Sequence, residues 1–173
     1  MKKLNSLNEA AEYVLSLTKG DLRIAFPLGL GKPNHLINLI YEKAQTHSQR
    51  KFEIYSALSL NPPEPKSDLE KRLLKPFLDR HFGEDYPRLK YVEDLLSEKM
   101  PPHIQVHEFY FAAGQFLKVP SAQQNYISLN YTHAARAIFD RGLHVIVQLI
   151  SAAKNSSQKY SLSCNPDMTL DLV

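Results

Sequence analysis

A strand, a glycine-containing turn, a helix and a second strand follow one another within the first 60 residues, and this order constrains the fold most. The patterns of residues 22–28 and 52–60 predict two short strands. Between them, Pro33 stands near the first turn of a helix predicted over 33–46. A strand–helix–strand unit of this length indicates parallel strands. We therefore predict an α/β fold with an open, mostly parallel sheet flanked by helices.

The remaining segments extend this pattern, with one interruption. Helices are predicted over 6–18 and 132–141, and a helical pair over about 67–82 and 87–99 interrupts the alternation. Ser67 and Glu70 form a capping box at the start of this pair. We interpret the pair, around 67–100, as an inserted subdomain or lid. Further strands are predicted over 103–111, 126–129, 144–150, which has the pattern of a buried central strand, and around 160–164, before another element begins within 167–173.

Composition is that of an ordinary globular domain. The chain has 173 residues, of which 43% are hydrophobic and 23% charged, so it can bury a core and is one domain in length. A net charge of +3 without a dense basic block argues against nucleic-acid binding. We find neither a signal peptide nor an apolar run of the ~20 residues that a membrane crossing needs. We therefore expect a soluble, cytoplasmic protein that binds no membrane.

The turn Gly29-Leu-Gly-Lys-Pro33 is the first candidate site. Glycines allow a ligand to approach the backbone, and the helix N-terminus that follows offers N–H groups to an anion. The alternative is a tight strand-to-helix turn that needs positive φ, and the sequence leaves both open. Asn34 replaces the third glycine of a dinucleotide fingerprint, and Pro33 replaces the Ser/Thr of a P-loop.

Histidine, glutamate and cysteine side chains are the other candidates for chemistry. His103 and His107 lie on a predicted strand, where four residues span roughly 13 Å, so we predict no metal site there. Glu108 stands among aromatic residues and could act as an acid or base, but a hydrogen-bonded structural role is the favoured interpretation. Cys164 is the single cysteine, which fits a reducing compartment, and it is interpreted as a small core residue.

Three stretches, in this order and spacing, resemble the N-terminal domain of the acetyl-CoA hydrolase/transferase family. They are Gly29–Pro33 with Leu36, then 109–114 with the strand-like 125–129, and finally 144–151 leading to 160–163. The resemblance covers about residues 20–173. The chain departs from the family at 152–159 and at Ser163, which replaces a glycine.

This resemblance implies a CoA-transferase architecture and a two-domain protein of which residues 1–173 are the N-terminal domain. It implies that a glutamate beyond Val173 attacks an acyl-CoA thioester, and that a carboxylate or water resolves the resulting glutamyl-CoA thioester. No catalytic residue is then expected here, and coenzyme A is a substrate rather than a cofactor. Gly29, Gly31, Lys32 and Pro33 are the expected ligand contacts, followed by a hairpin near 151–161.

The expected partners are an acyl-CoA and a small carboxylate, and exposed apolar surface could drive a homodimer. One alternative is a non-catalytic binding or regulatory module that keeps the fold, which the altered 152–159 stretch motivates. Another is a stand-alone nucleotide-binding domain, which the missing third glycine disfavours. A second α/β domain after residue 173, with a glutamate near a glycine-rich loop, would favour the enzyme.

Overall fold

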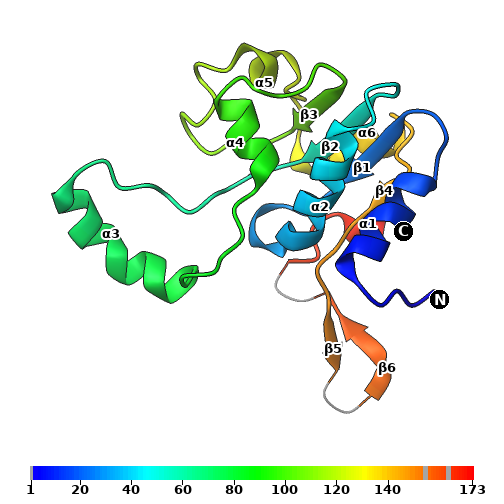
Figure 1. The fold of residues 1–173 in the computed structure, drawn as a ribbon, viewed down its shortest axis with the longest axis horizontal. Coiled ribbons are helices and arrows are strands. Elements are labelled where there is room, and N and C mark those ends of the chain that lie inside the picture. The colour runs from blue at the N-terminus through cyan, green and yellow to red at the C-terminus, as the bar shows by residue number, and fades with distance from the viewer. Residues whose placement is uncertain (1, 154–155, 163–164) are drawn as a thin grey trace.

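The structure is a computed structural model that describes residues 2–153, 156–162 and 165–173. At its centre lies a four-stranded sheet in the order β3-β2-β1-β4 (Figure 1). Every pairing in this sheet is parallel. Its strands are β1 (Leu22–Ala25), β2 (Phe52–Ser56), β3 (Ile104–Glu108) and β4 (Val145–Ile146). The predicted α/β fold with a parallel sheet is confirmed.

Helices cover both faces of the sheet. On one face α1 (Leu7–Ser16), α2 (Asn34–Gln45) and α4 (Lys90–Leu96) enclose the larger apolar core. On the other face α6 (Ala134–Phe139) and α7 (Thr169–Leu172) enclose a smaller one. The two helices predicted first, over 6–18 and 33–46, are therefore confirmed as α1 and α2.

The two helices predicted around 67–100 are present, but only the first stands apart as an insertion, because α4 packs in the larger core as the crossover between β2 and β3. The first helix, α3 (Asp68–His81), begins at the N-cap Ser67, whose hydroxyl accepts a hydrogen bond from Glu70 N at 3.2 Å. Gly83 ends it with a left-handed φ of 67°. In Figure 1, α3 projects away from the sheet and from the other helices. The second helix begins at Lys90 rather than near residue 87.

Two strand predictions are wrong. Residues 126–129 form no strand: Ile127 N donates to Glu108 O at 2.9 Å, and the chain then leaves the sheet. The apolar run 144–150 is not a buried central strand, because β4 is half-buried, only two residues long and at the edge of the sheet. Apolar composition predicted burial, but Leu149 and Ile150 are exposed beyond the strand.

The C-terminal part contains a separate two-stranded antiparallel sheet. β5 (Ser151–Ala153) pairs with β6 (Ser156–Ser161), so the strand predicted around 160–164 begins earlier than expected. Cys164 lies outside the described residues. A short helix that the sequence did not indicate, α5 (Pro120–Gln124), follows β3. In the part of the chain that the structure describes, no helix has both the length and the apolar composition that a membrane crossing requires.

Candidate functional site at the carboxyl edge of the sheet

A pocket lies where the order of the strands reverses. The chain runs from β1 outward to β2 and β3, then returns to β4 on the other side of β1. In open α/β sheets the loops diverge at such a point, and ligands bind there, beyond the carboxyl ends of the strands. A pocket of about 480 Å³ occupies this position, which we call the switch-point pocket. It is lined by Leu7, Leu30, Lys32–Leu36, Tyr86, Pro87 and Gln148–Ile150.

The C-terminal segment of the chain packs against the Gly29–Gly31 turn and hydrogen-bonds to the residue before it. Gly29 has a left-handed φ of 58°, and a Cβ on Gly31 would lie 2.9 Å from Asn165 O. Asn165 Nδ2 donates to Leu28 O at 2.6 Å, and Asp167 Oδ2 accepts from Leu28 N at 2.8 Å. Both glycines therefore serve the tight strand-to-helix turn. Their contact with a ligand stays a prediction.

Lys32 is buried, with 4% of its surface exposed, although it also lines the switch-point pocket. Its Nζ donates to Ala57 O at 2.6 Å and is therefore turned towards the loop after β2. Burial lowers the pKa of Lys32 to about 8, against the opposing charges of Glu108 and Asp167. The aliphatic part of Lys32 therefore lines the pocket, whereas its ammonium group lies in the interior of the protein.

Glu108 ends β3 with 1% of its surface exposed, and neither carboxylate oxygen has a hydrogen-bond partner among the described residues. Burial raises the pKa of Glu108 to about 7, while Ser59 and Lys32 oppose the rise. Ser59 lowers the pKa of Glu108 through both its hydroxyl and its backbone N–H, and the same hydroxyl shares a 2.6 Å hydrogen bond with Tyr91 Oη. The interpretation of Glu108 as a hydrogen-bonded structural residue therefore stays a prediction, with Ser59 as the candidate partner.

Five buried residues form one polar cluster beside the pocket: Lys32, Ser56, Ser59, Tyr91 and Glu108. Ser56 is the register partner of Glu108, and its hydroxyl has no hydrogen-bond partner among the described residues. Burial also raises the pKa of the Tyr91 hydroxyl above its ordinary range. A buried amine and a buried carboxyl whose pKa values lie near neutrality can hold or exchange a proton. The residue types alone did not reveal this cluster, because its members come from four segments that are distant in sequence.

The two histidines contact different parts of the chain. His103 Nε2 lies 3.0 Å from Ala44 O, whereas His107 stacks on Tyr55 with ring centroids 4.9 Å apart. Burial lowers the pKa of His107. Within residues 2–153, 156–162 and 165–173, no group of three or more His, Cys, Asp and Glu side chains is arranged to hold a metal ion.

The β5–β6 hairpin, the second predicted ligand contact, begins directly after the pocket residues Leu149 and Ile150. Gln148, which the sequence did not single out, fixes this junction. Its Nε2 donates to Asn165 O at 3.1 Å, and its Oε1 accepts from Thr169 Oγ1 at 2.7 Å. The hairpin strand β5 is itself exposed.

Comparison of the chain with protein-family models, curated proteins and solved structures finds no match. The family resemblance therefore depends on the residues and their order alone.

Proposed function

We propose that this chain is the acyl-CoA-binding half of a CoA transferase or acyl-CoA hydrolase, and that the switch-point pocket takes the thioester-bearing arm of coenzyme A. The position of that pocket, between the loops after β1 and β4, is the observation that carries the proposal. Its volume of about 480 Å³ is within the usual range for small-molecule sites.

The lining of the pocket suits this ligand. Leu30, Leu149 and Ile150 supply apolar surface for the methyl and methylene groups of the arm. The start of α2 also lines the pocket, where Asn34 N donates to Lys32 O at 3.0 Å and the N–H groups of His35 and Leu36 come next in the first turn. They can donate to an amide carbonyl or phosphate oxygen of the ligand. The predicted contacts Lys32 and Pro33 also line the pocket.

In this proposal the nucleophilic glutamate belongs to a second domain, as the resemblance implies, and acyl transfer takes place where the two domains meet. Glu108 is not assigned that role, because it is buried and lies outside the residues lining the pocket. The chain supplies binding and orientation, which hold the thioester for attack.

Binding of coenzyme A to this chain, measured by titration calorimetry, tests the proposal. Leu149→Asp places a charge in the pocket at a partly exposed position, so the chain should still fold. We expect the Kd for coenzyme A to rise at least about tenfold, which corresponds to ~1.4 kcal/mol. Leu117→Asp, at an exposed position outside the pocket, should leave the Kd unchanged. Equal Kd values for both variants and the parent chain, or no binding at all, would overturn the proposal.

Measuring the turnover of acyl-CoA distinguishes an enzyme from a non-catalytic module. The complete gene product should consume acetyl-CoA, with or without succinate as acceptor, and this chain alone should not. Coenzyme A binding without turnover of any of a panel of acyl-CoAs by the complete protein would instead support a non-catalytic module that keeps the fold.

A further inference from the structure

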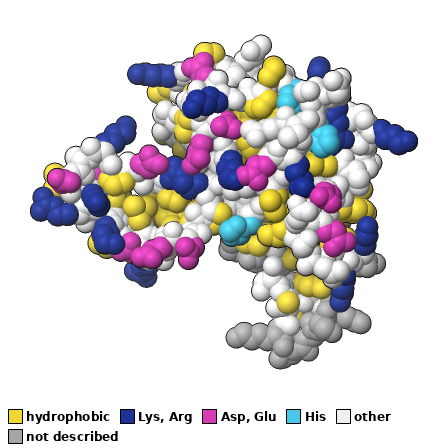
Figure 2. All heavy atoms as spheres, viewed as in Figure 1, with side chains coloured by type: hydrophobic (Ala, Val, Ile, Leu, Met, Phe, Trp, Pro, Cys, Tyr) yellow, Lys and Arg dark blue, Asp and Glu magenta, His cyan; other side chains and the backbone are white. Residues whose placement is uncertain are grey.

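Helix α3 has an apolar stripe that is largely uncovered in the described chain, where Phe77 has ring contacts only with His81 and Phe82 at the end of the same helix. None of its 14 residues is buried, and Leu69 and Leu73 are 71% and 76% exposed. Phe77 continues the stripe one turn later, since residues four apart share a helix face. Figure 2 shows hydrophobic side chains on this arm between acidic and basic ones. A helix of this length with Pro76 inside it is marginal in water without a partner.

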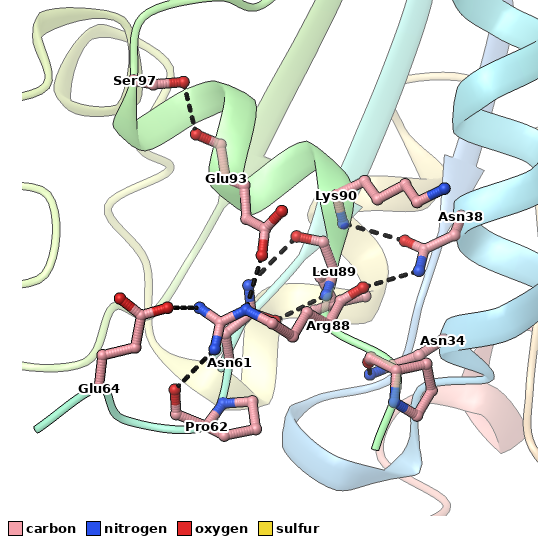
Figure 3. Close-up of polar contacts among 11 residues, drawn as sticks. Asn34, Asn38, Asn61, Pro62, Glu64, Arg88, Leu89, Lys90, Glu93 and Ser97 are labelled. Carbon is pink, nitrogen blue, oxygen red and sulfur yellow. Dashed lines mark hydrogen bonds and ion pairs between the residues drawn. The ribbon is translucent and has the colours of Figure 1, made fainter. Parts of the chain in front are cut away.

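The base of this arm is fixed to the body of the protein (Figure 3). Where the chain leaves and returns, Asn61 and Leu89 exchange two hydrogen bonds, of 2.7 and 3.2 Å. Asn38 of α2 donates to Arg88 O at 2.7 Å and accepts from Lys90 N at 3.0 Å. These contacts hold the backbone of both connections at one place.

Arg88 adds side-chain contacts to the same base. Its guanidinium donates to Pro62 O at 3.2 Å and pairs with Glu64 at 3.0 Å and Glu93 at 2.6 Å. The arm therefore projects from an organised base.

We propose that α3 is a dimerisation arm that packs antiparallel against α3 of a second copy of this chain. The charges at its ends favour this partner: Asp68 and Glu70 stand in the first turn, and Arg80 and His81 in the last. A two-fold axis across the helix brings the acidic start of each copy to the basic end of the other. The helix dipoles also run antiparallel in this arrangement. Parallel packing would instead bring like charges together.

The same charges define a register. If Glu70 of one copy lies level with His81 of the other, the axis passes between Lys75 and Pro76. Leu73 is then level with the partner helix at residue 78, and Leu74 with the partner helix at residue 77. The apolar residues meet in the middle, and the charged turns flank them at both ends. A single helix pair buries less than a standard interface, so we expect a dimer that forms at micromolar or higher concentration.

Sedimentation of the whole chain over a range of concentrations tests the dimer. The double variant Leu73→Gln, Phe77→Gln removes the apolar stripe but keeps good helix formers. We expect its dimer dissociation constant to rise at least about tenfold. The matched variant Lys71→Gln, Arg72→Gln changes two residues outside the apolar stripe and should leave the constant within about threefold. At a concentration where the parent chain is monomeric, thermal unfolding should be unchanged in both, because α3 contributes no buried residue.

Cross-linking tests the antiparallel register, in a background where Cys164→Ser removes the native thiol. In the proposed dimer, two copies of Leu74→Cys lie about 4.5 Å apart along the axis, whereas two copies of Leu69→Cys lie about 20 Å apart. A short thiol cross-linker should therefore join the first variant and not the second. Equal cross-linking of both, a chain that stays monomeric at several hundred micromolar, or equal dissociation constants for the two glutamine variants would overturn the proposal.

Discussion

Helices α2 and α3 are similar in length and pattern, but they end in opposite environments. α2 has 12 residues and α3 has 14, and each shows an apolar stripe at helical spacing. α2 buries Asn34, Ile37, Asn38, Ile40, Tyr41 and Ala44, whereas α3 buries no residue at all. Periodicity therefore predicts that a helix forms and which face is apolar, but not what covers that face.

Connections explain the difference. α2 lies between two parallel neighbours, β1 and β2, and a crossover of this kind must pack back onto the sheet. α3 follows the segment Asn61–Pro65, which contains three prolines, and returns through the polar base around Arg88. Proline disfavours helix in the residue before it and extends the chain. The extended connection carries α3 beyond the reach of the core.

The largest expected contrast is in core stability. Ile40→Ala removes a fully buried side chain between α2 and the sheet, and should lower the free energy of unfolding by about 2–5 kcal/mol. Leu73→Ala, in α3, should change it by less than about 0.5 kcal/mol. Urea denaturation followed by circular dichroism measures both, at a concentration where the chain is monomeric. A loss above ~1.5 kcal/mol for Leu73→Ala would mean that α3 packs on the body after all.

The second contrast concerns charge. Ionisable residues in α3 are solvated, whereas the body buries Lys32 and Glu108. Glu108 has a pKa raised to about 7, so the folded state binds the extra proton, and stability should fall as pH rises from about 4.5 to about 7. Lys32 has a pKa lowered to about 8, so stability should rise again as pH increases from about 8 to about 10.5. We predict a minimum in the free energy of unfolding between these two limbs.

Substitution of Glu108 tests whether this residue causes the fall in stability at acidic pH. Glu108→Gln keeps the shape of the side chain without its titration, so the fall between about pH 4.5 and 7 should shrink by roughly 1–3 kcal/mol. Asp79→Asn, in the exposed Lys75–Asp79 pair of α3, serves as the control and should leave the pH profile unchanged. A Glu108→Gln profile that follows the parent chain would show that Glu108 keeps an ordinary pKa.

Local signals predicted much of the fold, and contacts distant in sequence account for what was missed. Ser67 and Gly83 marked the ends of α3, because capping and positive φ depend on neighbouring residues. By contrast, the partner of Lys32 is a carbonyl 25 residues away, so its burial is a tertiary effect. Residues of the predicted contact loop line a pocket. The pocket residues around Gln148 could not be predicted, because only the order of the strands brings β4 next to β1.

The smallest expected difference between the body and α3 concerns two similar helix N-caps. Ser6 and Ser67 each accept a hydrogen bond from the N–H three residues later, at 3.1 Å in α1 and 3.2 Å in α3. In each case the carboxylate at that third position, Glu9 or Glu70, accepts from the N–H before the cap. Each serine→alanine change therefore removes an equivalent interaction, with a cost of about 1 kcal/mol to its helix.

Only Ser6→Ala should change the global free energy of unfolding, because α1 packs against α2 and its loss uncovers the core. Ser67→Ala should instead increase amide hydrogen exchange within α3 and leave global unfolding unchanged, because that helix can fray without exposing buried residues. Hydrogen exchange and urea denaturation on the same two variants measure both quantities. If Ser67→Ala also lowered global stability by about 1 kcal/mol in the monomer, α3 would be coupled to the sheet through its base. The arm would then fold and unfold with the body rather than independently of it.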